Sequence, residues 1–304
     1  MTRLKADLTL LMVSMIWGTT FILVKNELVY LGPMALIFWR FLIATFVLAP
    51  FLLKSALRAS KFTWMIGGFV GIFLGLGYLF QTYGMQFTNT SKAGFLTATY
   101  VAIVPLLSFL IFKNLPSLRS LIGVVLVSGG MALLCLNQRY EFQPGDLLLL
   151  GCAFWFSSQV VFIGHFTQGK WKLDPLALAW IQVAVATGVA AVGTGWWEDF
   201  RVDFPLKTWG VITFLGVVAT ALAFFAQTYA QKYTSSTHAA LMFMGEPVFA
   251  ALIGWGWADE VLTLRQWAGC ATILVGMWIA EVGLTPVFYF SQQVYRRLPR
   301  LGRG

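Results

Sequence analysis

Charged side chains are scarce in this sequence. Only 11% of its 304 residues are Asp, Glu, Lys or Arg, whereas 59% are hydrophobic. A water-soluble domain carries about 25% charged residues, so this chain has too few to cover a globular surface. The mean hydropathy of +0.77 points the same way. The composition therefore excludes a soluble protein and predicts one whose solvent is the lipid bilayer.

Motifs for chemistry are missing as well. The sequence has no G-x-x-x-x-G-K-[ST] loop, which excludes ATP as the direct energy source, and neither H-E-x-x-H nor G-x-S-x-G occurs. Its three cysteines, Cys135, Cys152 and Cys270, fall in apolar segments without paired spacing. Such cysteines are typical of small buried side chains. We therefore expect no catalytic residues, no bound metal, no cofactor and no enzyme activity.

Long apolar segments make up most of the chain. A helix needs about 20 mostly apolar residues to cross a bilayer. The sequence therefore predicts an all-α integral membrane protein with ten transmembrane helices and short loops between them. The expected spans are 8–27, 34–53, 62–85, 93–112, 118–136, 146–165, 175–196, 208–230, 237–257 and 264–284.

The net charge of +9 would suggest a nucleic-acid partner in a soluble protein, but here its distribution indicates topology. Arg40, deep in a span, and Lys92, at a span start, are set aside, which leaves 21 − 2 = 19 Lys and Arg residues in loops, in termini or near span ends. A cytoplasmic N-terminus places 14 of these 19 on the cytoplasmic side. This bias predicts a multi-pass protein with both termini in the cytoplasm and no nucleic-acid partner.

The second half of the chain repeats the first. Gln81-Thr82-Tyr83 returns as Gln227-Thr228-Tyr229, at an offset of 146, and Pro33–Arg40 aligns with Pro175–Gln182 at an offset of 142. Because each copy holds five spans, an odd number, the second copy is inverted in the membrane. We predict a first five-helix repeat at 1–140, a second at 141–284, and a basic cytoplasmic tail at 285–304. Inverted repeats of this kind build secondary transporters, which hold the substrate near mid-membrane between the halves.

Two ionisable residues lie deep within predicted spans, where charge is costly and often functional. Arg40 lies about 10 Å into the second span, at 1.5 Å per residue, and Glu246 lies near the middle of the ninth. In the functional interpretation Arg40 binds a carboxylate or phosphate, while Glu246 binds an amine or a proton. In the structural interpretation the two form an ion pair, or Arg40 caps helix-end carbonyls.

Other polar and aromatic residues within the spans are weaker candidates for a cavity wall. They hydrogen-bond a solute in the functional interpretation, and they bond a neighbouring helix or fill the core in the structural one. Gln182 is the repeat equivalent of Arg40. The set comprises Gln182, Gln81, Tyr83, Gln227, Tyr229, Tyr100, Trp17 and Trp155.

Two further repeat pairs bear on conformational change. Pro105 and Pro247 are equivalent and predict a kinked helix in each half, which is either a gate or a feature of shape. Lys92 is equivalent to His238, at the start of the fourth and ninth spans. For Lys92 we favour snorkelling to the interface. For His238 we favour a solvated side chain, with pH sensing as the alternative.

Glycines recur at matched positions and favour close helix packing. Gly67, Gly71 and Gly75 form a small-residue ridge in the third span, and Gly123 and Gly130 recur as Gly269 and Gly276. Close packing within the chain is the favoured interpretation. A homodimer contact is the alternative.

Several motifs resemble those of the EamA-type members of the drug/metabolite transporter superfamily. They cover about residues 5–284 and comprise Ile16–Thr19, Phe38–Phe41, Thr90–Leu96 with Pro105, Gly245–Leu252, Asp259-Glu260 and Leu262–Gln266. The resemblance implies a ten-helix bundle with cytoplasmic termini, two inverted five-helix repeats and a central cavity. It also implies movement of small metabolites such as amino acids and their analogues, often outward. One departure is Lys113–Pro116, which replaces an acidic residue found after the fourth span in many members.

Together these observations predict a secondary transporter, acting as an exporter, in the bacterial inner (plasma) membrane. It would move small polar or amphipathic metabolites by alternating access, with the lipid bilayer and a small-molecule substrate as partners and protons as a candidate coupling ion. Two alternatives remain open. One is an obligate exchanger of anionic metabolites, and the other is a non-transporting membrane sensor or scaffold.

Overall fold

A computed structural model describes residues 1–88, 90–135, 143–200, 202–257 and 261–282, and the elements of these residues are all helices. The first half contains α1 (Arg3–Gly18), α2 (Thr20–Glu27), α3 (Pro33–Leu57), α4 (Lys61–Gly84), α5 (Thr90–Ala98), α6 (Tyr100–Phe112) and α7 (Leu118–Cys135). The second half contains α8 (Pro144–Thr167), α9 (Pro175–Trp197), α10 (Leu206–Gly216), the π-helical η1 (Val217–Leu222), α11 (Ala223–Gln231), α12 (Ser236–Phe243), α13 (Gly245–Trp257) and α14 (Leu264–Val282). The predicted tail, 285–304, lies outside the described residues.

These helices form ten consecutive segments that match the predicted spans to within a few residues. By length and composition, nine segments of the described chain could cross a membrane, and α14 occupies the place of the tenth. The largest differences lie at two ends: α1 begins at Arg3 rather than residue 8, and α3 continues to Leu57 rather than residue 53. Thr2 caps α1, since its hydroxyl accepts from the Lys5 N–H at 3.4 Å. The predicted all-α membrane fold is confirmed.

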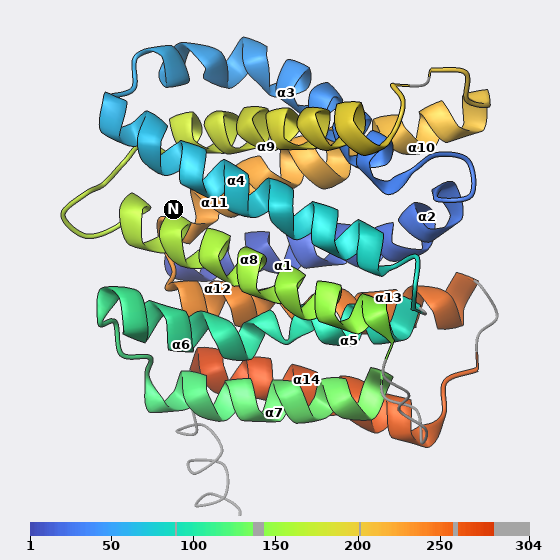
Figure 1. Cartoon of the computed structure of the whole chain (residues 1–304). Coiled ribbons are helices and arrows are strands. Elements are labelled where there is room, and N and C mark those ends of the chain that lie inside the picture. The colour runs from blue at the N-terminus through green and yellow to red at the C-terminus, as the bar shows by residue number, and fades with distance from the viewer. Residues whose placement is uncertain (89, 136–142, 201, 258–260, 283–304) are drawn as a thin grey trace, which may run out of the picture.

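Equivalent helices of the two halves meet each other inside the bundle. Thr45 and Thr187 are equivalent (187 − 45 = 142), and their hydroxyl oxygens lie 2.9 Å apart. Along α7 and α14, a Cβ at Gly123 would lie 2.9 Å from the Gly276 oxygen, and one at Gly130 would lie 2.8 Å from the Gly269 oxygen. Figure 1 shows the two pairings, α3 with α9 and α7 with α14, at opposite edges of the bundle. This is the arrangement that an inverted repeat requires.

The glycine ridge of α4 also packs within the chain. A Cβ at Gly71 would lie 2.8 Å from the Gln182 oxygen of α9, and one at Gly75 would lie 2.9 Å from Cβ of Val189. The predicted packing role is therefore confirmed for both sets of glycines. Their surfaces are used inside the molecule, so they are not free to form the predicted alternative, a homodimer contact.

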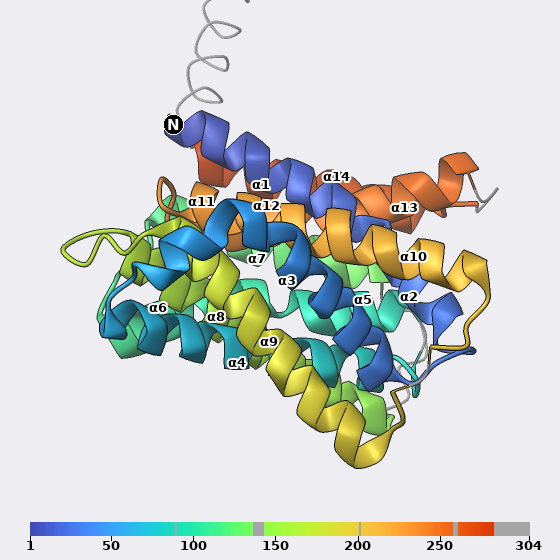
Figure 2. The ribbon, with the colours of Figure 1, turned by 90° about the horizontal axis from the view of Figure 1, so that it is seen from above.

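Four interruptions divide the membrane-length segments. Breaks lie at Thr19, Thr99 and Met244, and the fourth is the π-helical stretch η1. The sequence predicts kinks at Pro105 and Pro247, but the helices break six and three residues earlier, because 105 − 99 = 6 and 247 − 244 = 3. Pro105 lies inside α6, whereas Pro247 lies in the first turn of α13, where its missing N–H removes no helical bond. Figure 2 shows α1 running beside α12 and α13, which brings the breaks near Gly18 and Met244 together.

Candidate functional site in the central cavity

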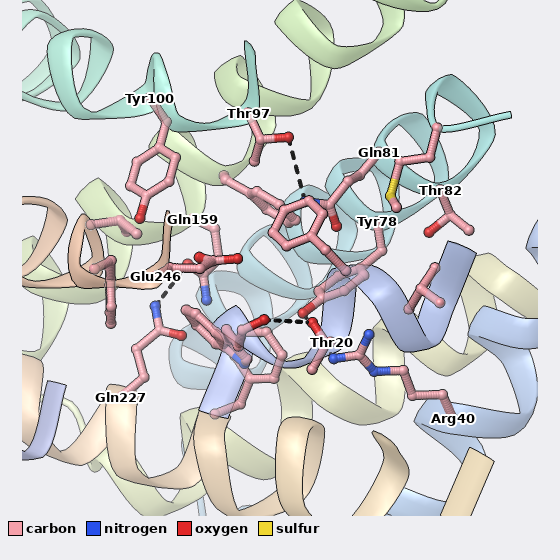
Figure 3. Close-up of a pocket in the computed structure, with 18 residues that line it drawn as sticks. Thr20, Arg40, Tyr78, Gln81, Thr82, Thr97, Tyr100, Gln159, Gln227 and Glu246 are labelled. Atoms are coloured by element: carbon pink, nitrogen blue, oxygen red, sulfur yellow. Dashed lines mark hydrogen bonds between the residues drawn. The ribbon is translucent and has the colours of Figure 1, made fainter. Parts of the chain in front are cut away.

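A cavity lies between the two halves in the middle of the bundle, with a volume of about 50 Å³ for the centres of water-sized molecules. Both halves contribute to its wall, and the contributing residues converge from helices far apart in the sequence (Figure 3). Its polar residues are Thr20, Arg40, Tyr78, Gln81, Thr82, Thr97, Tyr100, Gln159, Gln227 and Glu246. A second cavity shares Phe21, Thr97, Tyr100 and Glu246 with the first.

Arg40 is held by both halves of the protein. Its Nη2 donates to the Tyr78 hydroxyl and to the Ala219 carbonyl, each at 3.2 Å, and its Nε donates to the Thr220 hydroxyl. Its guanidinium carbon lies 4.6 Å from the centroid of the Tyr78 ring, close enough for a cation–π interaction. The Arg40 side chain is only 3% exposed, so these contacts replace most of its solvation.

The π-helical turn of η1 makes the Ala219 carbonyl available. The Thr220 hydroxyl donates to Leu215, five residues earlier, at 2.8 Å. The Ala219 carbonyl accepts from Trp17 Nε1 at 2.9 Å as well as from Arg40. Single π turns inside α-helices occur frequently at functional sites. Here the turn ties α1 and α3 of the first half to the second half beside the cavity.

Glu246 is the acidic group of the cavity. It is the second residue of α13, directly after the break at Met244, and it lines both cavities. Among the described residues no hydrogen bond or ion pair is made by its carboxyl group, and it does not pair with Arg40. The N-terminal end of a helix favours negative charge, so the break provides a suitable position for a carboxylate that faces open space.

Glutamine side chains form a hydrogen-bonded row that begins at the cavity wall and continues behind it. Gln227 Nε2 donates to Gln159 at 3.1 Å, Gln159 Nε2 donates to Gln182 at 2.9 Å, and Gln182 Nε2 donates to the Thr228 hydroxyl at 2.6 Å. Gln227 also donates to Gln231 at 3.2 Å, but its own buried Oε1 has no hydrogen-bond partner. An unpaired buried acceptor is costly, and a donor group of a bound solute would satisfy it.

Aromatic rings form the apolar part of the wall. The Trp17 ring centroid lies 5.3 Å from that of Phe224 and 5.2 Å from that of Phe243. Tyr78 packs edge-on against Phe156 at 5.2 Å. These rings give the cavity an apolar surface beside its polar groups, as in many small-molecule sites.

The structure brings six of the candidate residues to the cavity: Trp17, Arg40, Gln81, Tyr100, Gln227 and Glu246. Gln182 is fully buried one layer behind, bonded to Gln159. Tyr83 and Tyr229 are 41% and 36% exposed; Tyr83 packs at a tilt against Phe87, and Tyr229 stacks on Phe225. Each tyrosine follows the glutamine of its motif, Gln81 or Gln227, by two residues, which corresponds to a rotation of about 200° around the helix. The tyrosine therefore faces away from the cavity when the glutamine faces it.

Trp155 is also directed away from the cavity. Its ring centroid lies 5.8 Å from that of Phe73, and the next residue, Phe156, lines the cavity wall instead. Sequence reasoning further missed Tyr78, Thr220 and Phe224, and it did not select Gln159, a polar residue in the middle of the sixth span, as a site residue. For Tyr78 and Phe224 the repeat carried a signal, because they are equivalent (224 − 78 = 146) and lie one turn before Gln81 and Gln227.

Lys92 and His238 differ from the favoured sequence interpretations of a snorkelling and a solvated side chain. Lys92 is 8% exposed and its Nζ lies 2.7 Å from Asp146 Oδ2. His238 is 1% exposed and its Nε2 lies 3.8 Å from Asp7 Oδ2. Both side chains are buried because each finds a carboxylate on a helix of the other half.

The fold and cavity together define a polytopic membrane transporter, with broken helices from two inverted halves around a central polar space. The profile of the EamA-like transporter family matches residues 4–136 and again 143–281. The chain belongs to this family, as the sequence motifs indicated. It is a transporter rather than an enzyme.

Related proteins of several organisms bear the same general description. An uncharacterized transporter of Archaeoglobus fulgidus is 34% identical over 281 residues, which cover 92% of this chain and 87% of the relative. The uncharacterized transporter YyaM of Bacillus subtilis is 22% identical and covers 92% of this chain and 95% of its own. A solved structure, described only as a crystal structure of a protein, superposes with a TM-score of 0.77 at 18% identity, over 92% of this chain and 98% of its own. That likeness concerns the fold alone.

Proposed function

We propose that this transporter exports small polar or amphipathic metabolites, such as amino acids or their analogues, across a bacterial inner membrane by alternating access. The carboxyl group of Glu246 is the observation that carries this proposal. It lies in the central cavity between two inverted halves and has no partner among the described residues. A carboxylate held in this way is suited to a ligand's ammonium group or to a proton.

The cavity supports recognition of both ends of a zwitterion. Glu246 and the free Oε1 of Gln227 accept hydrogen bonds from an ammonium group, and the rings of Trp17 and Phe224 cover an apolar side chain. Arg40 uses Nε and Nη2 for protein contacts, and none of its described hydrogen bonds uses Nη1. Nη1 is therefore the donor that would meet a carboxylate.

The proposed orientation places the N-terminus and the 285–304 tail in the cytoplasm, with halves at 1–140 and 141–284. The distribution of Lys and Arg supports it. In this orientation the cavity lies between the halves and is reached from either side as they rock. Glu246 is also the proposed site of proton coupling, because a carboxylate binds either a proton or an amine but not both.

Flux into proteoliposomes tests the proposal, with candidate amino acids first selected by thermal stabilisation of the purified protein, since a ligand that prefers the folded state raises its melting temperature. Solute movement that depends on the protein is expected. Stabilisation by a ligand without flux would contradict transport and favour the sensor interpretation.

Two variants then separate the roles of the charges. Glu246→Gln removes the response of flux to a pH gradient, while exchange at equal pH survives for a solute that lacks an ammonium group; an unchanged response would remove Glu246 from coupling. Arg40→Lys selectively weakens carboxylated substrates because the planar fork of donors is lost. An equal loss for substrates with and without a carboxylate would show that Arg40 does not read that group.

A further inference from the structure

Two buried charge pairs occupy equivalent positions at the two ends of the molecule. Ala6-Asp7-Leu8 aligns with Gly145-Asp146-Leu147 (146 − 7 = 139), and Lys92 aligns with His238 (238 − 92 = 146). In the structure each basic residue meets the acidic residue of the opposite half: Lys92 meets Asp146, and His238 meets Asp7. The repeat has therefore placed the same kind of contact at both ends.

Each pair bridges the halves where a cavity would have to open. His238 in α12 and Asp7 in α1 lie at the N-terminal face, where α1 and α12 begin, whereas α5 and α8, which hold Lys92 and Asp146, begin at the opposite face (Figure 1). Asp7 is 3% exposed and Asp146 is 0% exposed. Separating α1 from α12, or α5 from α8, would part the corresponding pair and expose it to water.

The two pairs differ in one chemical respect. Lysine keeps its charge across the physiological range, whereas histidine is the side chain that ordinarily gains or loses a proton near neutral pH. Arg3 Nη2 lies 3.2 Å from Nδ1 and 3.3 Å from Nε2 of His238. A guanidinium only donates, so Arg3 can hydrogen-bond only to a ring nitrogen that carries no proton.

Protonation of this imidazole would change its partners. An imidazolium repels Arg3 and attracts Asp7, whose Oδ2 already lies 3.8 Å from Nε2. The contact between α12 and α1 then becomes a charged one, in which Asp7 Oδ2 is shared between His238 and Arg3, whose Nε lies 3.6 Å from it. The neutral form provides no such attraction.

We propose that His238 and Asp7 form a proton-binding site that closes the N-terminal face when it is occupied, with Lys92 and Asp146 as its fixed-charge counterpart at the opposite face. This inference rests on the alternating access of the proposed function. A proton bound at His238 favours the state that is closed at the N-terminal face and open at the other. Its release favours the reverse.

Other titratable or charged groups lie on the elements packed around His238. In the adjoining cavity of the N-terminal face they are Arg3, His165, Lys170 and Tyr233. The helices packed against α12 carry further titratable or charged residues besides Arg3 and Asp7 of α1 and His165 of α8. They are Lys5 of α1, Tyr100 of α6, Arg119 and Cys135 of α7, Asp146 and Cys152 of α8, Glu246 of α13, and Arg265, Cys270 and Glu281 of α14. The side chain of Glu281 lies outside the described part. The chain has only two histidines, so His165 is the matched control for titration near neutral pH.

Distances between spin labels test the proposal without a substrate. Labels at Leu8 of α1 and at Lys232, before α12, are introduced with the three native cysteines replaced, and the protein is studied in nanodiscs from pH 5.5 to 8.5. We expect the closed population of the N-terminal face to rise as the pH falls, with the closed-to-open ratio changing by at least about fivefold. His238→Gln removes this change and His165→Gln retains it. Persistence of the change in His238→Gln, or its loss in His165→Gln, overturns the proposal.

Two further variants keep the test decisive if His238→Gln fails to fold. His238→Lys copies the other pair and is expected to hold the N-terminal face closed at every pH. Lys92→His moves the titratable group to the opposite face, so labels at Val29 and Leu147 acquire a pH response that the parent protein lacks. Absence of that response, or opening of the N-terminal face in His238→Lys, contradicts the proposal. A normal distance response without flux of any tested solute would instead refute transport and leave the proton site standing.

Discussion

Arg40 and Gln182 occupy equivalent positions in the two inverted halves, yet only Arg40 reaches the central cavity. Glu246 shows the same inequality, because its equivalent in the first half is Val104 (246 − 104 = 142), which is fully buried in an apolar cluster. Each half therefore supplies one charge, and the two charges come from non-equivalent positions. The comparison shows that a symmetric scaffold can hold an asymmetric site.

Backbone irregularities produce part of this difference. The break at Thr19 and the π-helical stretch η1 have no counterparts, since the equivalent helices α8 and α4 are continuous. Their contact, through Trp17 and the Ala219 carbonyl, lies directly beside Arg40. Gln182 faces continuous helices instead and joins the row of glutamines.

The largest effect on transport is expected for Glu246, the acidic residue of the cavity. Glu246→Gln keeps the shape of the side chain but removes the charge that would face a substrate's ammonium group. Loss of one partner from a buried charge pair costs about 2–5 kcal/mol, so transport of an amine-bearing solute should fall at least about 30-fold. Asp203→Asn, the same change in an exposed loop, should leave the initial rate of flux unaltered. Similar rates in the two variants would show that Glu246 does not contact the substrate.

Arg40→Gln tests the basic residue of the cavity, because it places in the first repeat the glutamine that the second repeat has at the equivalent position, Gln182. The Ala219 carbonyl and the Thr220 and Tyr78 hydroxyls lose a charged partner, and a hydrogen bond to a charged group contributes about 1.5–3 kcal/mol. We expect a free energy of unfolding about 2–3 kcal/mol lower, measured by denaturation in detergent. Gln182→Ala, which breaks two neutral hydrogen bonds, should cost about 1–2 kcal/mol. A larger cost for Gln182→Ala would reverse the comparison.

The glycines at the α7–α14 contact should respond alike in both halves, in contrast to the charges. Alanine at Gly130 or Gly269 places a Cβ 2.8 Å from a backbone oxygen of the other helix. Overpacking of this kind costs about 1–3 kcal/mol, and thermal unfolding should show it for both variants. Gly129→Ala is the control, because a Cβ there meets no atom within 4 Å. Equal melting temperatures for Gly129→Ala and Gly130→Ala would contradict the observed packing.

The smallest effects distinguish neighbours within one repeated motif. Tyr83→Phe and Tyr229→Phe should leave flux unchanged, because both rings lie outside the cavity. Gln81→Leu and Gln227→Leu each remove an amide from the wall, and loss of one hydrogen bond of about 1–1.5 kcal/mol reduces flux roughly tenfold. Equal flux in the tyrosine and glutamine variants would place the substrate elsewhere.

The spans were predictable because hydrophobic length is set by the bilayer and because the chain carries its own repeat. The faces of the helices were not. Trp155 and Phe156 are adjacent in an apolar helix. A span that meets lipid on one side and packed helices on the other is apolar on both sides, so its sequence pattern does not show which side faces the cavity. The repeat compensated in part, since Gln81 and Gln227 both line the cavity.

The contacts of the charged residues could not be read from spacing along the chain. Lys92 and His238 are near helix starts, where exposure is the usual outcome, and their burial depends on Asp146 and Asp7 from the opposite half. An alignment of Asp7 with Asp146 was the available signal. The π-helical turn at Ala219 and Thr220 left no comparable trace, because it depends on tertiary packing around Arg40.

Access to the cavity from both faces is the central claim, and labelling at Thr97 tests it most directly because this residue lines both cavities beside Glu246. Thr97→Cys, with the three native cysteines replaced, is exposed to a membrane-impermeant thiol reagent in vesicles of each orientation. Alternating access predicts modification from either face, with modification from one face blocked when conditions close that face. Modification from a single face under every condition would contradict it.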